Sequence, residues 1–270
     1  MEKRLLIKIA EEYIRFSEGN YITENNAISQ KVIGMKIFED PILAFGSAED
    51  DYFEMFKKPW IIGEHFITPK AWLPQAKTII SLFLPFSQSV REGNKQDMTW
   101  PSDEWLHGRI EGQTLINKLA LFLKKELEDA GYYSLVPSLD ERYREAKYSS
   151  NWSERHVAFV CGHGTFSLSK GFITRKGMAG RFGSIITELH LPPDERTYEN
   201  VYEYCIMCGK CVKNCPVKAI SLENGKNHAI CAKFLDTTAQ KFKPRYGCGK
   251  CQIAVPCESG IPFNRKRAGI

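Results

Sequence analysis

The sequence predicts a domain of mixed helices and strands followed by a small cysteine-rich module. Strand-like and helical patterns succeed one another through the first part of the chain, and eight of the nine cysteines lie between Cys205 and Cys257. Residues 192–200 begin with two prolines and continue as a polar run, which is typical of a boundary between domains. We therefore expect domains at residues 1–195 and 196–270. Periodicity alone leaves α+β and α/β architectures open for the first.

Composition places the chain among globular proteins. Of its 270 residues, 43% are hydrophobic and 26% are charged. The longest apolar stretch, residues 78–86, is far shorter than the roughly 20 residues of a membrane span. Glu11 and Glu12 stand where a signal peptide requires apolar residues. We therefore expect no targeting segment and a cytoplasmic protein.

Three elements follow in order from the first half. Residues 1–16 place apolar and charged residues at helical spacing, which predicts a helix. Residues 76–86 are rich in β-branched and large apolar side chains, which predicts a buried strand that ends at Pro85. Ser102 has the character of an N-cap before a long apolar stripe, and we expect that helix to end near Gly131.

The stretch before the boundary predicts one more helix and one more strand. Residues 152–160 fit a helix that opens at Asn151 or Ser153. A glycine-punctuated region, residues 162–183, leads into a strand within residues 182–191.

The first cysteine run predicts iron–sulfur chemistry. Cys205, Cys208, Cys211 and Cys215, with Pro216 behind them, form the CxxCxxCxxxCP run of bacterial-type ferredoxins. Three thiolates two residues apart wrap one cubane, and the fourth, which leads into an expected helix, faces a second cluster. Structural zinc, the alternative, takes its ligands in separated pairs.

The second cysteine run is irregular, because its last member follows after five residues instead of three. Ligands cross over between the motifs of two-cluster ferredoxins, and eight cysteines divide evenly by four. We therefore expect cluster one to take Cys205, Cys208, Cys211 and Cys257, and cluster two to take Cys215, Cys231, Cys248 and Cys251. The alternative is one cluster with a zinc ion or free thiols. The ninth cysteine, Cys161, fits a buried free thiol, with a nucleophile or ligand as the alternative.

A plain ferredoxin needs only a chain of the size of residues 196–270. The electrons of the clusters need an acceptor, so we expect the first domain to hold a terminal acceptor, a substrate, or both. Residues 162–167 depart from the dinucleotide fingerprint at its last position, which disfavours nicotinamide binding. Residues 177–183 could bring the backbone close to a large flat cofactor, or they could form an ordinary glycine-rich turn. His156 and His163 could donate to a ligand or be structural.

Four motifs in succession resemble the epoxyqueuosine reductase group, relatives of the corrinoid-dependent reductive dehalogenases. They are residues 152–166 (WSERHVAFVCGHGTF), residues 181–189 (RFGSIITEL), the CxxCxxCxxxCP run, and residues 246–252 (YGCGKCQ). The resemblance extends over about residues 69–262.

This resemblance implies the rest of the expected architecture and its cofactors. It implies an α+β fold, with a nitroreductase-like domain of the cobalamin-binding type followed by a ferredoxin-like module with two [4Fe-4S] clusters. Electrons would come from an external one-electron donor such as a ferredoxin or flavodoxin and pass through the clusters to cobalamin. The segments that would line the corrin contribute Gly162, Gly164, Phe166, Arg181, Phe182 and Gly183.

Tyr148 stands where the epoxyqueuosine reductases carry an aspartate general acid, six residues before Glu154. A tyrosine is the proton donor in the reductive dehalogenases, so the resemblance implies that Tyr148 is catalytic; a half-buried core tyrosine is the alternative. The tRNA-acting members carry a helical-repeat domain after the clusters, whereas this sequence stops at Ile270. The sequence therefore argues against a tRNA substrate.

The function predicted is an iron–sulfur oxidoreductase that reduces a small-molecule substrate through a corrinoid. The alternative is an electron-transfer protein that reduces a partner's cofactor and has no substrate chemistry of its own. From Arg196 onward the chain has 13 basic and 5 acidic residues. Each oxidised cluster with its thiolates carries about −2, so this basic excess can compensate buried anions and does not itself predict RNA binding.

Overall fold

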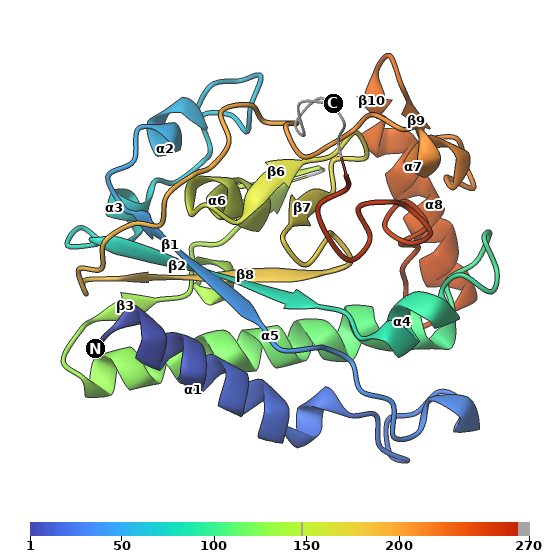
Figure 1. Ribbon diagram of the computed structural model, residues 1–270, viewed down its shortest axis with the longest axis horizontal. Helices are drawn as coiled ribbons and strands as arrows, with labels where there is room; N and C mark the ends of the chain where they lie inside the picture. Colours follow the sequence, from blue (N-terminus) through green and yellow to red (C-terminus); the bar gives the residue numbers. More distant parts are fainter. Residues whose placement is uncertain (147, 264–270) are drawn as a thin grey trace.

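The structure, a computed structural model, describes residues 1–146 and 148–263. At its centre lies a four-stranded antiparallel sheet in the order β1-β2-β8-β3 (Figure 1). Its strands are β1 (Ile42–Ser47), β2 (Thr78–Pro85), β8 (Gly180–Thr187) and β3 (Ser134–Leu135). Purely antiparallel pairing is typical of α+β proteins, whereas α/β proteins are built on parallel strands. The expected mixture of helices and strands is therefore confirmed, and the antiparallel sheet favours the α+β alternative over α/β.

Helices and short hairpins surround this sheet. The helices are α1 (Lys3–Phe16), α2 (Tyr52–Met55), α3 (Pro69–Trp72), α4 (Gln88–Gly93), α5 (Asp103–Asp129), α6 (Glu154–Val160), α7 (Lys210–Lys213) and α8 (His228–Lys241), with 3-10 turns η1 (Glu18–Asn20), η2 (Gln30–Val32) and η3 (Pro137–Leu139). The hairpins pair β4 (Glu145–Ala146) with β5 (Ser149–Ser150), β6 (Gly164–Phe166) with β7 (Phe172–Thr174), and β9 (Ile220–Ser221) with β10 (Gly225–Lys226). No helix in the described ranges is long and apolar enough to cross a membrane.

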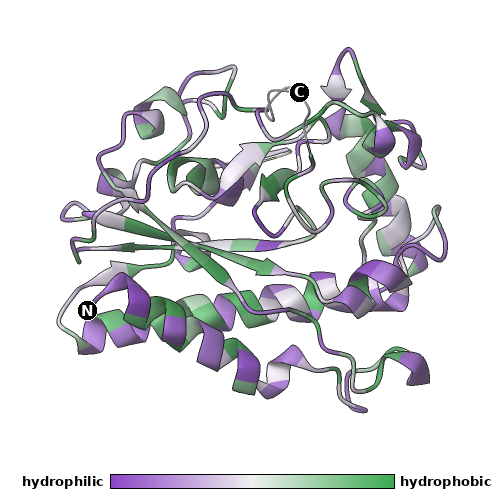
Figure 2. Ribbon diagram, viewed as in Figure 1, coloured by the Kyte–Doolittle hydropathy of each residue, from purple (hydrophilic) through white to green (hydrophobic). Residues whose placement is uncertain are grey.

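The sheet is covered on both faces, which explains the unbroken apolar run of β2. Successive side chains of a strand point to opposite faces. Ile80, Leu82 and Leu84 belong to the core between the sheet and the helices α1 and α5. Ile79 belongs to a second core on the other side of the sheet. Figure 2 shows the matching pattern, with hydrophobic strands between helices whose outer faces are hydrophilic.

The long helix α5 begins and ends where the sequence predicts. The Ser102 hydroxyl accepts a hydrogen bond from the Trp105 backbone N–H at 3.3 Å, which is the expected N-cap contact. The helix ends at Asp129, and Gly131 follows with a left-handed φ of +88°.

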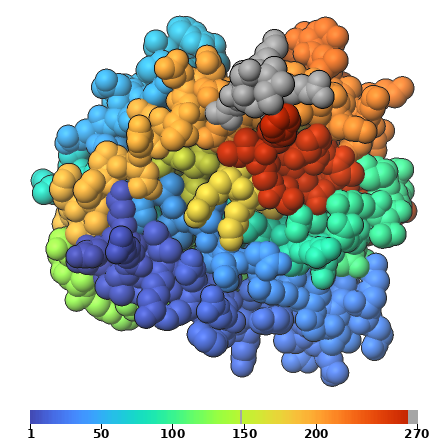
Figure 3. Space-filling model, viewed as in Figure 1, coloured from blue at the N-terminus to red at the C-terminus, as the bar shows by residue number. Residues whose placement is uncertain are grey.

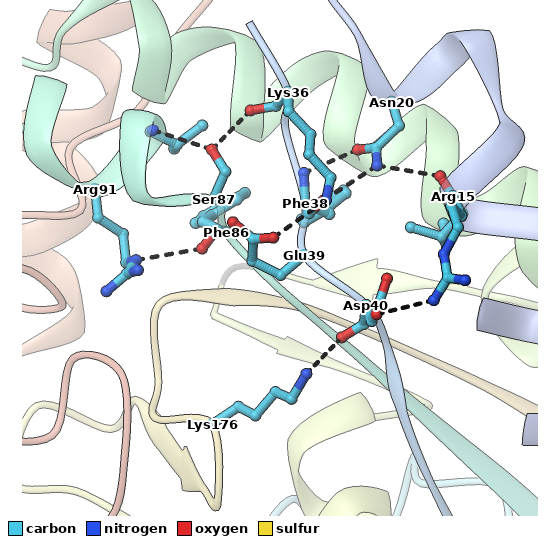
Figure 4. Close-up of polar contacts among 12 residues, drawn as sticks. Arg15, Asn20, Lys36, Phe38, Glu39, Asp40, Phe86, Ser87, Arg91 and Lys176 are labelled. Atoms are coloured by element: carbon cyan, nitrogen blue, oxygen red, sulfur yellow. Dashed lines mark hydrogen bonds and ion pairs between the residues drawn. The ribbon is translucent and has the colours of Figure 1, made fainter. Parts of the chain in front are cut away.

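A buried asparagine fixes the chain between α1 and β1. Asn20 is fully buried, and its side-chain amide donates to the carbonyl oxygens of Ile14 and Phe38. Its carbonyl oxygen accepts from the Phe38 backbone N–H at 2.8 Å (Figure 4). Nearby, the Ser87 hydroxyl donates to the Lys36 carbonyl at 2.7 Å, which ties the same segment to the end of β2. Every polar atom of the asparagine amide is thereby satisfied.

The cysteine-rich segment packs against α5 and the core that this helix covers. Arg245 forms an ion pair with Glu111 of α5, and Ile253 is part of the core beneath the sheet. Figure 3 shows residues near the end of the described chain in contact with the region around α4. The helix expected after Cys215 is wrong: the chain turns there, with a left-handed φ of 52° at Lys218, and then enters β9.

Replacing Gly164 with alanine is expected to destabilise the fold strongly. Gly164 has a φ of +151°, and a Cβ atom there would lie 1.9 Å from the Ile173 carbonyl oxygen. We expect a cost of about 2–4 kcal/mol, because backbone of the β6–β7 hairpin must move. Gly131→Ala is the matched control, since Gly131 also has a left-handed φ but has no atom within 4 Å of the added Cβ. Its cost should be about 1 kcal/mol. Equal falls in apparent melting temperature would contradict the steric argument.

Candidate functional site

A cavity of about 770 Å³ opens between the start of α8 and segments that lie from Tyr52 to Tyr202. This volume lies toward the upper end of the range for cofactor and small-ligand sites. Five separate stretches of the chain supply its wall, at residues 52–62, 145–159, 166–170, 201–202 and 228. Its lining residues include Phe56, Trp60, Tyr148, Arg155, His156, Phe159, Phe166, Lys170, Tyr202 and His228.

The lining of this cavity combines two kinds of side chain. Phe56, Phe159 and Phe166 are aromatic and apolar. Arg155, Lys170 and His228 carry nitrogen donors, and Lys170 donates to the Tyr202 hydroxyl at 2.6 Å. A flat, largely apolar ligand that carries a negative group is the kind of molecule that this lining complements.

Tyr148 lies at the mouth of the cavity. Its side chain is 57% exposed, and its ring centroid lies 6.2 Å from that of His228 on α8. The alternative that Tyr148 is a half-buried core residue is therefore wrong. A hydroxyl in this position can meet both a ligand in the cavity and solvent, which is the situation of a group that donates a proton and recovers it.

His156 lies within the cavity wall, whereas His163 is part of the core. His156 hydrogen-bonds through Nδ1 to the Ser153 hydroxyl at 2.8 Å and packs against Phe166. Burial lowers its pKa to about 3, so its imidazole is neutral at physiological pH. His163 is buried and bonds through Nε2 to the Ser81 carbonyl at 2.9 Å. Of these two histidines, His156 is therefore the one that can meet a ligand in this cavity.

Of the six residues that the sequence assigns to the corrin wall, Phe166 lines the cavity. The structure places the others against protein: Gly164 against the Ile173 backbone, and Gly162 beside the Glu195 carbonyl. Gly183 faces Ile116 of α5.

The two remaining corrin-wall residues also contact the protein interior. Phe182 packs on the ring of Phe83 at 4.5 Å between centroids. Arg181 hydrogen-bonds to Gln113 of α5. The structure therefore brings Phe166, Tyr148 and α6 together at one cavity, and leaves the Arg181–Gly183 segment in the sheet beside it.

The four cysteines assigned to cluster one line a second, smaller cavity. They are Cys205, Cys208, Cys211 and Cys257. Cys257 comes from the irregular end of the second run, and the fold brings it to the first. Burial, together with the neighbouring thiols, raises the pKa of Cys211 to about 11 and that of Cys257 to about 12. Metal binding at this cavity would therefore displace thiol protons.

The four cysteines assigned to cluster two also interact with one another. Cys251 interacts electrostatically with Cys215 and Cys231, and Cys248 interacts with Cys231 and Cys251. Cys211 and Cys251 interact as well, so the two groups are neighbours. In the described part of the chain, no three histidine, cysteine or acidic side chains converge closely enough to hold a single metal ion. The thiols of the first group instead surround a shared space.

The backbone around both groups is bent in an unusual way. Four non-glycine residues with a left-handed φ occur in the described ranges: Lys170, Met207, Lys218 and Ala254. Met207 and Ala254 lie within the cysteine runs, and Lys218 lies three residues after Cys215. Lys170 lies in the β6–β7 turn, where the Leu168 N–H points to the Cys205 sulfur at 3.4 Å. Such strain persists where the surroundings enforce it, as around a site that aims backbone amides at sulfur. The donor set and its backbone fit iron–sulfur clusters.

Cys161 is a buried core residue. It is fully buried, and its sulfur lies 2.8 Å from the position of a Cβ added at Gly46. Burial raises its pKa, which opposes formation of a thiolate nucleophile. The expectation of a buried free thiol is confirmed.

The buried carboxyl group of Glu154 is expected to make the stability of the fold depend on pH. Its carboxyl oxygens are buried beside Ser138, Trp152 and Ser184, and burial raises its pKa to about 7. The folded state thus binds a proton that the unfolded state releases near its ordinary pKa of 4.5. The contribution of Glu154 to the free energy of unfolding is therefore present in full below the ordinary pKa, and it is lost as the pH rises from about 4.5 toward 7. Glu154→Gln is expected to remove this fall, as thermal unfolding between pH 5 and about pH 8 would show. If the stability of the variant fell with pH as steeply as that of the wild type, Glu154 would not be the cause of the fall.

Sequence reasoning missed two contributors to the cavity. Trp60 is 77% exposed in the loop after α2, and His228 begins α8. The signal for α8 was present, because the Asn227 side chain accepts from the Ile230 N–H at 3.1 Å as an N-cap. No local signal marks Trp60, whose role depends on residues distant in sequence.

The fold and the cysteine arrangement define an iron–sulfur protein, and comparison with known proteins agrees. The family described as a 4Fe-4S binding domain matches residues 199–221. An epoxyqueuosine reductase of Bacillus subtilis (strain 168) is 28% identical over 232 residues, which cover 79% of this chain and 55% of that protein. The resemblance seen in the sequence motifs is confirmed. The chain spans about half the length of this curated relative.

Solved structures share the fold. An epoxyqueuosine reductase crystallised with an epoxyqueuosine-modified tRNA-Tyr stem loop matches with a TM-score of 0.53 and 19% identity, over 96% of this chain and 68% of the other. A reductive dehalogenase, whose structure is described as suggesting a mechanism for B12-dependent dehalogenation, matches with a TM-score of 0.56 and 16% identity, over 85% of this chain and 31% of the other. At these identities the similarity concerns the fold.

Proposed function

We propose that this protein is an epoxyqueuosine reductase-like oxidoreductase that passes electrons through two [4Fe-4S] clusters to a corrinoid. Its domains would be a nitroreductase-like α+β domain over residues 1–195 and a ferredoxin-like module over residues 196–270. The observation that carries the proposal is the placement of Tyr148 in a cavity of about 770 Å³ beside two groups of four cysteines. An electron-transfer protein without substrate chemistry has no need of such a cavity.

The cysteine groups would hold the clusters as the sequence assigns them. Cys205, Cys208, Cys211 and Cys257 would bind the first, and Cys215, Cys231, Cys248 and Cys251 the second. Bound clusters would supply electrons one at a time. Cys208 is the exposed member of the first group, so a one-electron donor such as a ferredoxin or flavodoxin would approach there.

The aromatic and basic lining of the large cavity supports its assignment to a corrinoid. Phe56, Phe159 and Phe166 would pack on the flat apolar ring, and Arg155 and Lys170 would meet a negative group of the cofactor or substrate. Bound cobalamin would supply a low-valent cobalt centre for reduction. The chain itself would orient the ring, limit access of water through its aromatic side chains, and deliver a proton.

Tyr148 would be the proton donor. Reductive opening of an epoxide leaves negative charge on oxygen, and the phenol O–H at the cavity mouth would protonate that oxygen. The resulting phenolate would recover a proton from solvent, to which Tyr148 is 57% exposed.

A modified tRNA is the substrate class that the comparisons favour. The curated relative is an epoxyqueuosine reductase, and a fold relative has been crystallised with an epoxyqueuosine-modified stem loop. The argument against tRNA drawn from the sequence therefore loses its support.

The test is turnover of an epoxyqueuosine-modified tRNA stem loop by reconstituted protein with a chemical reductant. We expect reduction of the modified base and RNA affinity that falls steeply with salt. An unmodified stem loop is the control for turnover. Absence of both turnover and salt-dependent binding would exclude the tRNA substrate and leave a small-molecule substrate to be sought.

A further inference from the structure

A buried lysine lies between two of the proposed ligands of cluster two. Lys250 is fully buried, and its ammonium group donates to the Asn94 backbone carbonyl at 2.7 Å and to the Asn94 side-chain oxygen at 2.6 Å. Among the residues that the structure describes, it forms no ion pair. A buried ammonium without a negative partner is costly. The Cys248 thiol and the Asp97 carboxylate both act on it electrostatically, and thiolates that held the proposed second cluster would add further negative charge beside it.

The lysine is held firmly in this position. The Asn94 amide N–H donates to the Cys248 carbonyl at 3.0 Å, and its side-chain oxygen also accepts from the Ser102 N–H at the start of α5. Gly249 lies so close to Trp105 of α5 that an added Cβ would be 2.0 Å from the indole ring. The loop from Cys248 to Cys251 is therefore seated on the first domain with its lysine pointing inward.

The first cysteine group has a different environment. Its cavity is lined by apolar side chains such as Leu168, Ile173 and Met178, and the groups acting electrostatically on Cys257 are other thiols. Around the second group, Lys226 acts electrostatically on the Cys251 thiol, and so does the hydroxyl of Ser169, which also lines the cavity of the first group. Positive charge and hydrogen bonds near sulfur favour the more negative, reduced state of a cluster.

We propose that Lys250 raises the reduction potential of the second cluster above that of the first, so that electrons run from the first to the second. This inference rests on the two clusters of the proposed function. The placement of the groups agrees with that direction. The first group reaches the surface at Cys208 and Met207, where Met207 is 44% exposed. The second group adjoins the large cavity, because His228 lines that cavity one helical turn before Cys231.

The test is a redox titration followed by EPR on reconstituted wild type, Lys250→Met and a control. Methionine keeps the length and apolar stem of lysine but removes the charge. We expect the higher of the two potentials to fall so that the equilibrium constant for reduction drops at least tenfold, or about 59 mV for one electron. Lys233→Met is the matched control, since this exposed lysine lies two residues from Cys231. Solvent screens its charge, so we expect the equilibrium constant for reduction to change less than twofold in this control.

Ser169→Ala is a second variant that can be measured if Lys250→Met does not fold. Ser169 is buried, and loss of its hydroxyl should lower the same potential by a smaller amount. Unchanged potentials in Lys250→Met, or a shift of only the lower potential in that variant, would overturn the inference. Iron content separates this result from failure of the proposed function, because about eight iron ions per chain confirm two clusters whatever the potentials are.

Discussion

Tyr148→Phe is expected to lower turnover of the modified stem loop about 100-fold or more while leaving cluster reduction unchanged. The substitution removes one oxygen atom from a side chain that is 57% exposed, so it removes a proton donor with little effect on packing. General acid catalysis typically contributes 10²–10⁴-fold, which sets the size of the loss. Single-turnover kinetics, with the protein reduced in advance, measures the chemical step directly.

Tyr143→Phe is the control for this experiment. Tyr143 lies five residues earlier, and its hydroxyl donates to Glu145 at 2.8 Å. It is not among the residues that line the cavity. We expect nearly wild-type turnover from it. Equal losses in the two variants, or no loss in Tyr148→Phe, would show that Tyr148 does not deliver the proton.

Cys257→Ala is expected to remove one cluster, with iron falling from about eight to about four ions per chain. This cysteine follows the second motif at the wrong spacing, but the fold brings it into one cavity with Cys205, Cys208 and Cys211. Loss of one of four thiolates exposes a cubane to dissociation, and the donor could then no longer reach the second cluster through the first. Anaerobic iron and sulfide analysis with EPR of the reduced protein gives the result.

Cys161→Ala is the matched control for the loss of a cysteine. Cys161 is fully buried in the core and belongs to neither group. Its replacement should leave iron and EPR signals unchanged and cost only the stability of a small core cavity. Retention of about eight iron ions by Cys257→Ala would show that the ligand set of the first cluster is wrong.

The sequence was informative where the controlling interactions are local. The N-cap at Ser102 and the stripe of α5 predict that helix nearly to the residue, and the apolar run of β2 predicts a strand buried on both faces. The spacing of the first cysteine run predicts a shared site because its members are neighbours along the chain.

The sequence was least informative where distant segments meet. The wall of the large cavity joins the loop after α2, the β4–β5 hairpin and the start of α8, and no periodicity relates them. The segment from Arg181 to Gly183 carries a family motif, yet it forms part of β8 and packs on α5 and Phe83. Lys250 reads in the sequence as a charged residue between cysteines, and only the fold shows that it is buried against Asn94.

The most direct test of the central claim is anaerobic reconstitution with iron, sulfide and cobalamin, followed by metal analysis and EPR. We predict about eight iron ions and one cobalt ion per chain, with a base-off Co(II) signal. Phe166→Ala, which removes an aromatic ring from the cavity wall, should reduce cobalt retention without loss of iron. A full iron complement with no cobalt retained by the wild-type protein would contradict the corrinoid mechanism. Electron transfer to a partner's cofactor would then be the better account.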